Sequence, residues 1–366
     1  MNLPRNIVIG IWIGLIFVVL CGTMYLNLFD LGNAFRLGTI TGYEIFAGVA
    51  TTVNVLLPPG MANLTAWLEG YGIGNYIPGD VTLNWSPDNY PYLIAPVSDY
   101  NIYMSDNYTT GFNFNIPNLT LPNTATNYTD INAYPVPERY YVLRADNPSP
   151  LKDVNTDTWG KFDINLINTS VNNLNLASIP MIPANKSFSK VIVQNVSNFY
   201  IYQISTRNDT TGAWYTADYL GGFGINAWFG SPTYFTTMEP DEAYWIKSRY
   251  NKIFTLVGQV AIENRSVQVI NTSVNNLNLV GWTSVDKQNF ATAIRQNPSN
   301  FYIYQISTRN DTTGAWYTAD CLGGFGINAW FGSPTYFTSF EPGHGYWIKS
   351  RYNTVWNYKP NQVTWK

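Results

Sequence analysis

The sequence predicts a mainly β protein, in which an N-terminal transmembrane helix is followed by β-sandwich-like domains, the last two being a tandem duplication. Three observations predict this fold class. Residues 7–29 are uncharged and apolar, short aromatic and β-branched runs alternate with turn formers over most of the rest, and residues 198–251 recur at 300–353. The expected segments are 1–30, 31–60, 61–160, 161–260 and 261–366.

The composition is that of an ordered chain with few charges. Hydrophobic residues make up 46% of the 366 residues and charged residues only 12%, against about 25% charged residues in ordinary soluble domains. The net charge is -3 and no basic run occurs, so the electrostatic footprint of nucleic-acid binding is missing. Such a surface suits a hot or acidic habitat, because few carboxylates are left to protonate, or a surface that glycans keep soluble.

The first segment, residues 1–30, is predicted to be a membrane anchor. Its 23 residues from Ile7 to Phe29 carry no charge, and a helix of this length crosses a hydrocarbon core of roughly 30 Å. A cleaved signal peptide is the alternative, but the sequence "CGTMYLNLF" offers no A-x-A site. Arg5 precedes the helix and favours a cytoplasmic N-terminus, which places the remaining chain outside the membrane.

The second segment, residues 31–60, is apolar but interrupted by Glu44 and several glycines. Three arrangements are compatible with it: a second membrane span, a pair of core strands, or a helix packed against neighbouring subunits, as in a filament. The glycines argue against one unbroken helix through both segments.

Glycosylation sequons support an exported chain. The motif N-x-[S/T] is spread over the chain after the anchor and is absent before it, although a chain rich in Asn and Thr also forms this short motif by chance. The candidate acceptors are Asn63, Asn84, Asn107, Asn118, Asn127, Asn168, Asn185, Asn195, Asn208, Asn264, Asn271 and Asn310.

The third segment, residues 61–160, is predicted to be a β-rich extracellular domain. Short β-prone runs such as "YNIYM" (100–104) and "FNFNI" (112–116) alternate with Pro- and Asn-rich turns, which is typical of a sandwich or barrel. A Pro/Asn/Asp-rich stretch after residue 146 predicts a linker and a domain boundary near residue 160.

The last two segments are predicted to be copies of one small β-rich module. Residues 198–251 match 300–353 with six differences, and the sequence "NTSVNNLNL" precedes both copies. The runs "FYIYQIS", "AWYTAD", "PTYFT" and "YWIKSRY" predict strands, with "RNDTTG", "GGFGIN" and "FGS" between them. The connecting sequence "FTLVGQVAIENRSVQVIN" is compatible with further strands. Two copies favour tandem beads or a pair with two-fold pseudo-symmetry.

The second module resembles a family of repeat modules found in archaeal and bacterial S-layer-like and adhesin-like surface proteins. The resemblance is carried by "NLNLVGWTS" and "FEPGHGYWIK", which look like the N-L-x-G-W opening and P-G-x-G-Y-W-I ending of those modules. The first module departs from this pattern with "LASIPMIP" and "EPDEAYWIK". The resemblance covers roughly the 170 residues of the two modules. It implies an extracellular structural or adhesive protein and no enzyme.

The module tryptophans allow two interpretations. Aromatic side chains fill the cores of small β domains, and aromatic faces also form platforms for sugar rings. Strand alternation predicts that Trp245 and Lys247 face one side of the sheet and Tyr244 and Ile246 the other. The candidate contacts with a glycan or partner are Trp214, Trp228, Trp245, Trp316, Trp330 and Trp347.

No catalytic, cofactor or metal site is predicted. His344 is the sole histidine, and Glu242 occupies its position in the first module, so a His-dependent mechanism would depend on one unrepeated residue. The nucleotide, zinc-protease and EF-hand motifs are absent. A glycosidase carboxylate pair and loop Ca²⁺ binding remain alternatives for the recurring acids, which are Asp209, Asp218, Glu239, Asp311, Asp320 and Glu341.

The sequence therefore predicts a membrane-anchored, glycosylated extracellular structural protein. It would build or decorate a surface assembly, such as a cell-envelope lattice, a filament or an archaeal virion spike. The expected partners are the membrane through residues 7–29, copies of the chain or other envelope or virion proteins, and glycans. The alternative function is an adhesin that binds carbohydrate through its aromatic-rich modules.

Overall fold

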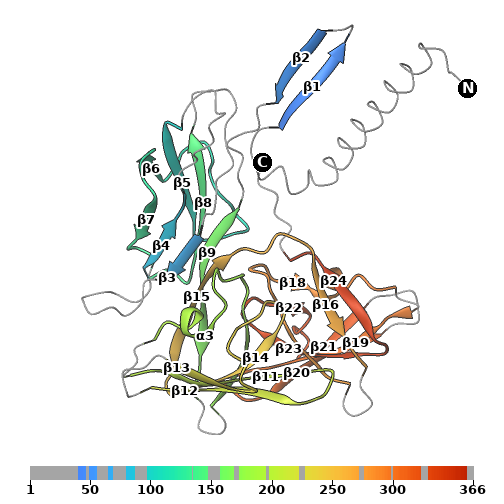
Figure 1. Ribbon diagram of the computed structural model, residues 1–366. Helices are drawn as coiled ribbons and strands as arrows, with labels where there is room; N and C mark the ends of the chain where they lie inside the picture. The colour runs from blue at the N-terminus through green and yellow to red at the C-terminus, as the bar shows by residue number, and fades with distance from the viewer. Residues whose placement is uncertain are drawn as a thin grey trace, which may run out of the picture.

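The computed structural model is mainly β and is built from antiparallel sheets arranged in sandwich-like domains (Figure 1), which confirms the predicted fold class to this extent. It describes residues 40–46, 49–55, 65–68, 80–86, 97–133, 135–146, 157–168, 173–194, 198–221, 227–271, 276–297, 300–322 and 329–360. Within these ranges, no helix has both the length and the apolar character needed to cross a bilayer. The anchor predicted over residues 7–29 lies outside them.

The apolar segment after the anchor contains a hairpin. Strands β1 (Ile40–Phe46) and β2 (Val49–Val55) pair in antiparallel register along their whole length. Of the three arrangements that the sequence leaves open for this segment, the structure therefore has a pair of strands.

The first domain is a sandwich of a three-stranded and a five-stranded sheet, with strand orders β3-β4-β7 and β15-β9-β8-β5-β6. Its core joins Val81 and Leu83 of the smaller sheet to Ile102, Tyr141 and Leu143 of the larger one. The strands are β3 (Thr65–Leu68), β4 (Val81–Asn84), β5 (Asp99–Ser105), β6 (Leu119–Pro122), β7 (Asn127–Asp130), β8 (Glu138–Asp146), β9 (Thr158–Leu166) and β15 (Lys252–Gln259).

Two long strands connect this domain to the first module (Figure 1), and the boundary predicted near residue 160 falls inside one of them, β9. The first half of β9 pairs with β8 and places Trp159 in the core of the first domain. Its second half places Phe162, Ile164 and Leu166 in the core of the module, and β15 pairs with β9 over its whole length. The two cores therefore share one strand pair.

The two modules have the same five-stranded sheet, with orders β10-β14-β11-β12-β13 and β17-β23-β19-β20-β21. The first consists of β10 (Leu174–Ser178), β11 (Ile201–Arg207), β12 (Trp214–Leu220), β13 (Ala227–Ser231) and β14 (Ala243–Ser248). The second consists of β17 (Asn278–Gly281), β19 (Ile303–Arg309), β20 (Trp316–Leu322), β21 (Ala329–Ser333) and β23 (Gly345–Ser350). A two-stranded sheet of β16 (Arg265–Val269) and β24 (Thr354–Tyr358) completes the second module, and β18 (Gln288–Asn289) pairs with β22 (Ser339–Phe340).

Most of the strands expected from the sequence are present, but two runs were assigned wrongly. "YNIYM" lies within β5 and the connecting sequence contains β15 and β16, as predicted. "FNFNI" forms a turn in which Phe112 and Phe114 stack, with Arg144 over the Phe114 ring. "PTYFT" is also largely a turn, and the strand lies just before it, because the "FGS" stretch read as a divider belongs to β13.

The cores of the modules differ more than their surfaces. In each, a short helix, α3 (Phe188–Val191) or α4 (Phe290–Ala293), covers the inner face of the sheet with a phenylalanine. The first core is then filled by Ile179, Met238, Phe254 and Leu256, and the equivalent positions of the second hold Trp282, Phe340, Trp356 and Tyr358. At these four positions the second core is entirely aromatic, whereas the first has one aromatic residue, Phe254.

Candidate functional site

The two modules pack against each other with two-fold pseudo-symmetry. The Asp209 carboxylate of the first module accepts a hydrogen bond from the Leu279 backbone N–H of the second, and the Arg207 guanidinium donates to the Leu277 carbonyl at 2.7 Å. The second module makes the same two bonds in return, through Asp311 to Leu176 and Arg309 to Leu174. Reciprocal contacts between equivalent residues define a self-complementary interface. Of the two arrangements predicted for the duplication, the structure therefore has the symmetric pair.

Small residues allow the two sheets to approach at the pseudo-symmetry axis. A Cβ at Gly345 would lie 2.6 Å from the Cβ of its equivalent, Ala243, and 2.9 Å from Leu176 Cδ1. Leu176, Ala243 and Leu279 form a small buried core at this point, with Trp245 and Trp347 packed against it. The glycine at 345 is thus required by close approach, and its φ is not positive, in agreement with the alanine at the equivalent position.

A groove of about 700 Å³ crosses this axis on the outer faces of the two sheets. Four tryptophans line it: Trp214 meets Trp347 edge to face with ring centroids 6.2 Å apart, and Trp245 meets Trp316 in the same way at 6.1 Å. Each pair combines one ring from each module, so neither module alone forms the site. The remaining lining residues are Leu174, Gln203, Ser205, Thr216, Lys247, Leu277, Gln305, Ser307 and Lys349.

Strand alternation explains why these side chains reach the groove. In β14, Tyr244 and Ile246 are fully buried under the sheet, and Trp245 and Lys247 are half-buried on its outer face, as the sequence predicted. Trp245 lies opposite Ser205 of β11 in the strand register. Rows of outward residues on adjacent strands therefore place tryptophan, lysine and small polar side chains beside one another.

Two of the six predicted tryptophans do not reach the groove. Trp228 packs against Phe188 and Tyr219, and Trp330 is buried against Phe290 in the second core. For these two tryptophans, the interpretation in which aromatic side chains fill the module cores is therefore the correct one. Sequence reasoning missed the glutamines and lysines of the groove as site residues. The lysines could have been found, because each follows a groove tryptophan by two residues and so faces the same side of the sheet. The glutamines lie opposite these lysines on the neighbouring strand, which only the strand register reveals.

The recurring acids do not converge on one catalytic or metal centre. Asp209 and Asp311 lie in the module interface, whereas Glu239 and Glu341 each pair with a lysine, Lys186 or Lys287. Asp218 and Asp320 accept hydrogen bonds from Gln203 and Gln305 at the edge of the groove. Within the described residues, no group of three or more His, Cys, Asp or Glu side chains is arranged to hold a metal ion.

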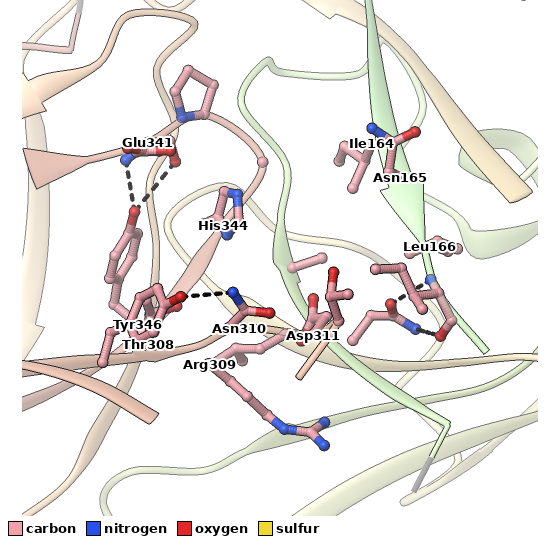
Figure 2. Close-up of a pocket in the computed structure, with 18 of the residues that line it drawn as sticks. Ile164, Asn165, Leu166, Thr308, Arg309, Asn310, Asp311, Glu341, His344 and Tyr346 are labelled. Carbon is pink, nitrogen blue, oxygen red and sulfur yellow. Dashed lines mark hydrogen bonds between the residues drawn. The ribbon is translucent and has the colours of Figure 1, made fainter. Parts of the chain in front are cut away.

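His344 lies in a second cavity, of about 490 Å³, between β9, β10 and the second module. Figure 2 shows the imidazole between Glu341 and the β9 residues Ile164 and Leu166, with Asp311 and Arg309 below it in this view. At the equivalent place in the first module, Asp241 replaces Gly343, and its carboxylate forms an ion pair with Arg265. The two equivalent places therefore differ: an ion pair in one corresponds to open space beside Gly343 in the other.

The sequon asparagines differ in exposure. Asn208 and Asn310 are half-buried, and the Nδ2 of each donates to a tyrosine hydroxyl, that of Tyr215 at 2.9 Å and that of Tyr317 at 2.7 Å. Asn63 and Asn195 lie outside the described residues. The exposed sequon residues are Asn84, Asn107, Asn118, Asn127, Asn168, Asn185, Asn264 and Asn271.

No protein-family model and no curated protein matches this sequence. The resemblance to S-layer-like and adhesin-like repeat modules therefore stays a prediction.

The interface carboxylates make stability depend on pH. Burial raises the pKa of Asp209 to about 7 and that of Asp311 to about 6, against the pull of the backbone N–H and the arginine beside each. Glu242 raises the pKa of Asp209 further, and His344 replaces this residue next to Asp311. Because the folded state holds these protons more tightly than the unfolded chain, their contribution is complete below pH 3.8 and is lost as pH rises through 6–7.

We expect the free energy of unfolding of the wild type to fall by about 4 kcal/mol between pH 5 and 8 relative to that of an Asp209→Asn/Asp311→Asn variant, which keeps an oxygen acceptor at both positions. Urea unfolding of both proteins at pH 5, 6, 7 and 8 measures this difference. A difference that stays constant over this range would contradict the assignment.

Proposed function

We propose that this chain is an exported, membrane-anchored surface protein whose paired modules bind a glycan in the four-tryptophan groove. The observation that carries the proposal is the arrangement of the tryptophans, two from each module, around an open groove bordered by amide, hydroxyl and ammonium groups. The predicted role in building or decorating a surface assembly stays a prediction.

The groove has the chemistry that a sugar chain requires. Indole rings provide flat apolar surfaces for the C–H faces of sugar rings, and they lose little conformational entropy on binding because they are already packed. Gln203 donates one hydrogen bond to Asp218, which fixes the side-chain amide and leaves its oxygen as an acceptor for a hydroxyl group. Ser205 and Thr216, which bond to each other across β11 and β12, add further hydroxyls.

The near-identity of the two copies is consistent with this function. The repeated segment supplies Gln203, Ser205 and Trp214 of the groove and also Arg207 and Asp209 of the interface. A change in this segment would therefore alter the ligand contacts and the module pairing together. None of the six positions that differ between the copies lines the groove.

Replacing Trp214 and Trp316 together by alanine should reduce glycan binding by at least about tenfold, since stacking on two rings is lost. Both side chains are about half exposed, at 51% and 50%, so the fold should be kept. Binding is measured by affinity electrophoresis against soluble β-glucan, mannan, galactan, dextran, dextran sulfate and polygalacturonate.

The matched control is Tyr250→Ala, which removes an aromatic ring that is 50% exposed but lies outside the groove. This variant should bind like the wild type. Retention of binding by the double tryptophan variant, or the absence of binding to every polysaccharide tested, would overturn the proposed function.

A further inference from the structure

The groove carries positive charge that the described part of the chain does not neutralise. Lys247 and Lys349 line it, whereas no aspartate or glutamate does, and neither lysine forms an ion pair within the described residues. The whole chain is acidic, with 23 carboxylate residues against 20 lysines and arginines. An acid-free groove with two unpaired lysines is therefore a local reversal of the overall charge.

The arginines near the groove, unlike the lysines, are already engaged in contacts within the protein. Arg207 lies 5.6 Å from the Trp347 ring centroid and donates to the Leu277 carbonyl, and its charge acts on the buried Asp209. Its counterpart Arg309 is equally engaged. These arginines hold the two modules together, so the charge available to a ligand is that of the lysines.

The carboxylates at the edge of the groove, Asp218 and Asp320, accept hydrogen bonds from glutamine amides and form no ion pair with the groove lysines within the described residues. Asp218 accepts a hydrogen bond from Gln203, and Gln203 lies between Asp218 and Lys247 in the strand register. One strand thus lies between the lysine and the carboxylate, and neighbouring strands are about 4.8 Å apart. The groove keeps an ammonium group next to each tryptophan pair without placing an acid there.

We infer that the groove selects an acidic glycan, with one carboxylated or sulfated sugar unit bound in each of two equal half-sites. One half-site consists of Trp245 and Lys247 of the first module with Trp316 of the second, and the pseudo-symmetry generates the other from Trp347, Lys349 and Trp214. This inference rests on the proposed function, because it names the ligand class of the same groove.

Two linked half-sites favour a polymer over its monomer. Once one acidic unit occupies a half-site, the next unit of the chain is held at high effective concentration near the other. A polyuronate should therefore bind more tightly than its free monosaccharide, even when both concentrations are expressed per sugar unit. Equivalence of the half-sites further predicts that Lys247→Gln and Lys349→Gln weaken binding by the same factor.

Single-stranded nucleic acid also combines negative charge with stacking rings. It is less consistent with this chain, because its binding requires a positive track along the backbone, and here two lysines stand on a chain of net charge -3. A single-stranded DNA oligonucleotide is therefore included in the experiment as a competing ligand.

The experiment compares polygalacturonate with its carboxyl-reduced form, which has the same backbone without charge, and dextran sulfate with dextran. We expect each acidic polymer to bind the full chain at least about tenfold more tightly than its neutral match, and we expect Lys247→Gln/Lys349→Gln to abolish that preference. The preference should also decline with added salt. The control variant is Lys252→Gln, an exposed lysine outside the groove.

The outcomes separate this inference from the function on which it rests. Equal binding of the charged and neutral forms, or an unchanged preference in the double lysine variant, overturns the acidic selectivity and leaves the proposed function standing. Absence of binding to every polysaccharide overturns both. If a single-stranded DNA of about 20 nucleotides binds as tightly as the polyuronate, the choice of ligand class is overturned.

Discussion

Replacing Asp241 by glycine should lower the free energy of unfolding by about 3 kcal/mol, because it leaves a partly buried guanidinium without its partner. The Asp241 carboxylate accepts hydrogen bonds from Arg265 Nε at 2.9 Å and from the Tyr358 hydroxyl at 2.7 Å. Glycine is the appropriate replacement, since Asp241 has φ 68° and the equivalent Gly343 has φ 77°, so the change removes the carboxylate without adding backbone strain. Urea denaturation at pH 7 measures the loss.

The symmetry-related contact suggests the control. Phe162 of β9 occupies the position equivalent to Arg265 of β16, and it lies against Gly343 of the second module, where a Cβ on the glycine would be 3.4 Å from Phe162 Cε1. An Asp241→Gly/Arg265→Phe variant should therefore be more stable than Asp241→Gly alone, by at least about 1 kcal/mol. Additive effects of the two substitutions would contradict a direct coupling between these residues.

Replacing Trp282 by alanine should cost about 3–5 kcal/mol, the range for removal of a large buried aromatic side chain. The indole is fully buried and stacks on Phe340 and Tyr358, with ring centroids 4.8 and 4.7 Å apart, and its Nε1 donates to the Asp286 carbonyl. Its loss should destabilise the second module most. Hydrogen exchange, followed separately in the two modules, distinguishes this from uniform destabilisation.

Trp316→Ala serves as the matched control for this experiment. It deletes the same atoms from a half-exposed position, so its effect on the free energy of unfolding should stay below about 1 kcal/mol. A comparable loss in both variants would show that burial in the aromatic core is not the reason for the stability attributed to Trp282.

Strand alternation and the repeat predicted much of this fold, because both are local properties of the sequence. The inward Tyr244 and the outward Trp245 follow from period-2 geometry. The approach of the two sheets does not follow from strand alternation, because it depends on contacts between residues far apart in the sequence, such as Asp209 and Leu279. The resulting groove was therefore outside the reach of the sequence, although four of its tryptophans were named as candidates.

The division of the six tryptophans had a similar cause. Trp214 and Trp228 both lie in repeated aromatic runs, and only the register between β12 and β13 decides which ring faces outward. In β13 the outward position belongs to Phe229, which is exposed, and Trp228 faces the core. The domain boundary near residue 160 was predicted from the Pro/Asn/Asp-rich stretch after residue 146. The strand that follows this stretch, β9, instead continues from the core of the first domain into the core of the first module.

The strand pair shared by those two cores also decides how the chain would carry a mechanical load. A pull on a ligand in the groove, resisted at the first domain, would act along β9, and the hydrogen bonds between β8 and β9 lie across that direction. Five residue pairs, from Glu138↔Phe162 to Val142↔Thr158, would then be sheared together instead of opening one after another. The junction between the domain and the module would therefore resist tension, which is what the proposed surface-attached binding protein would require.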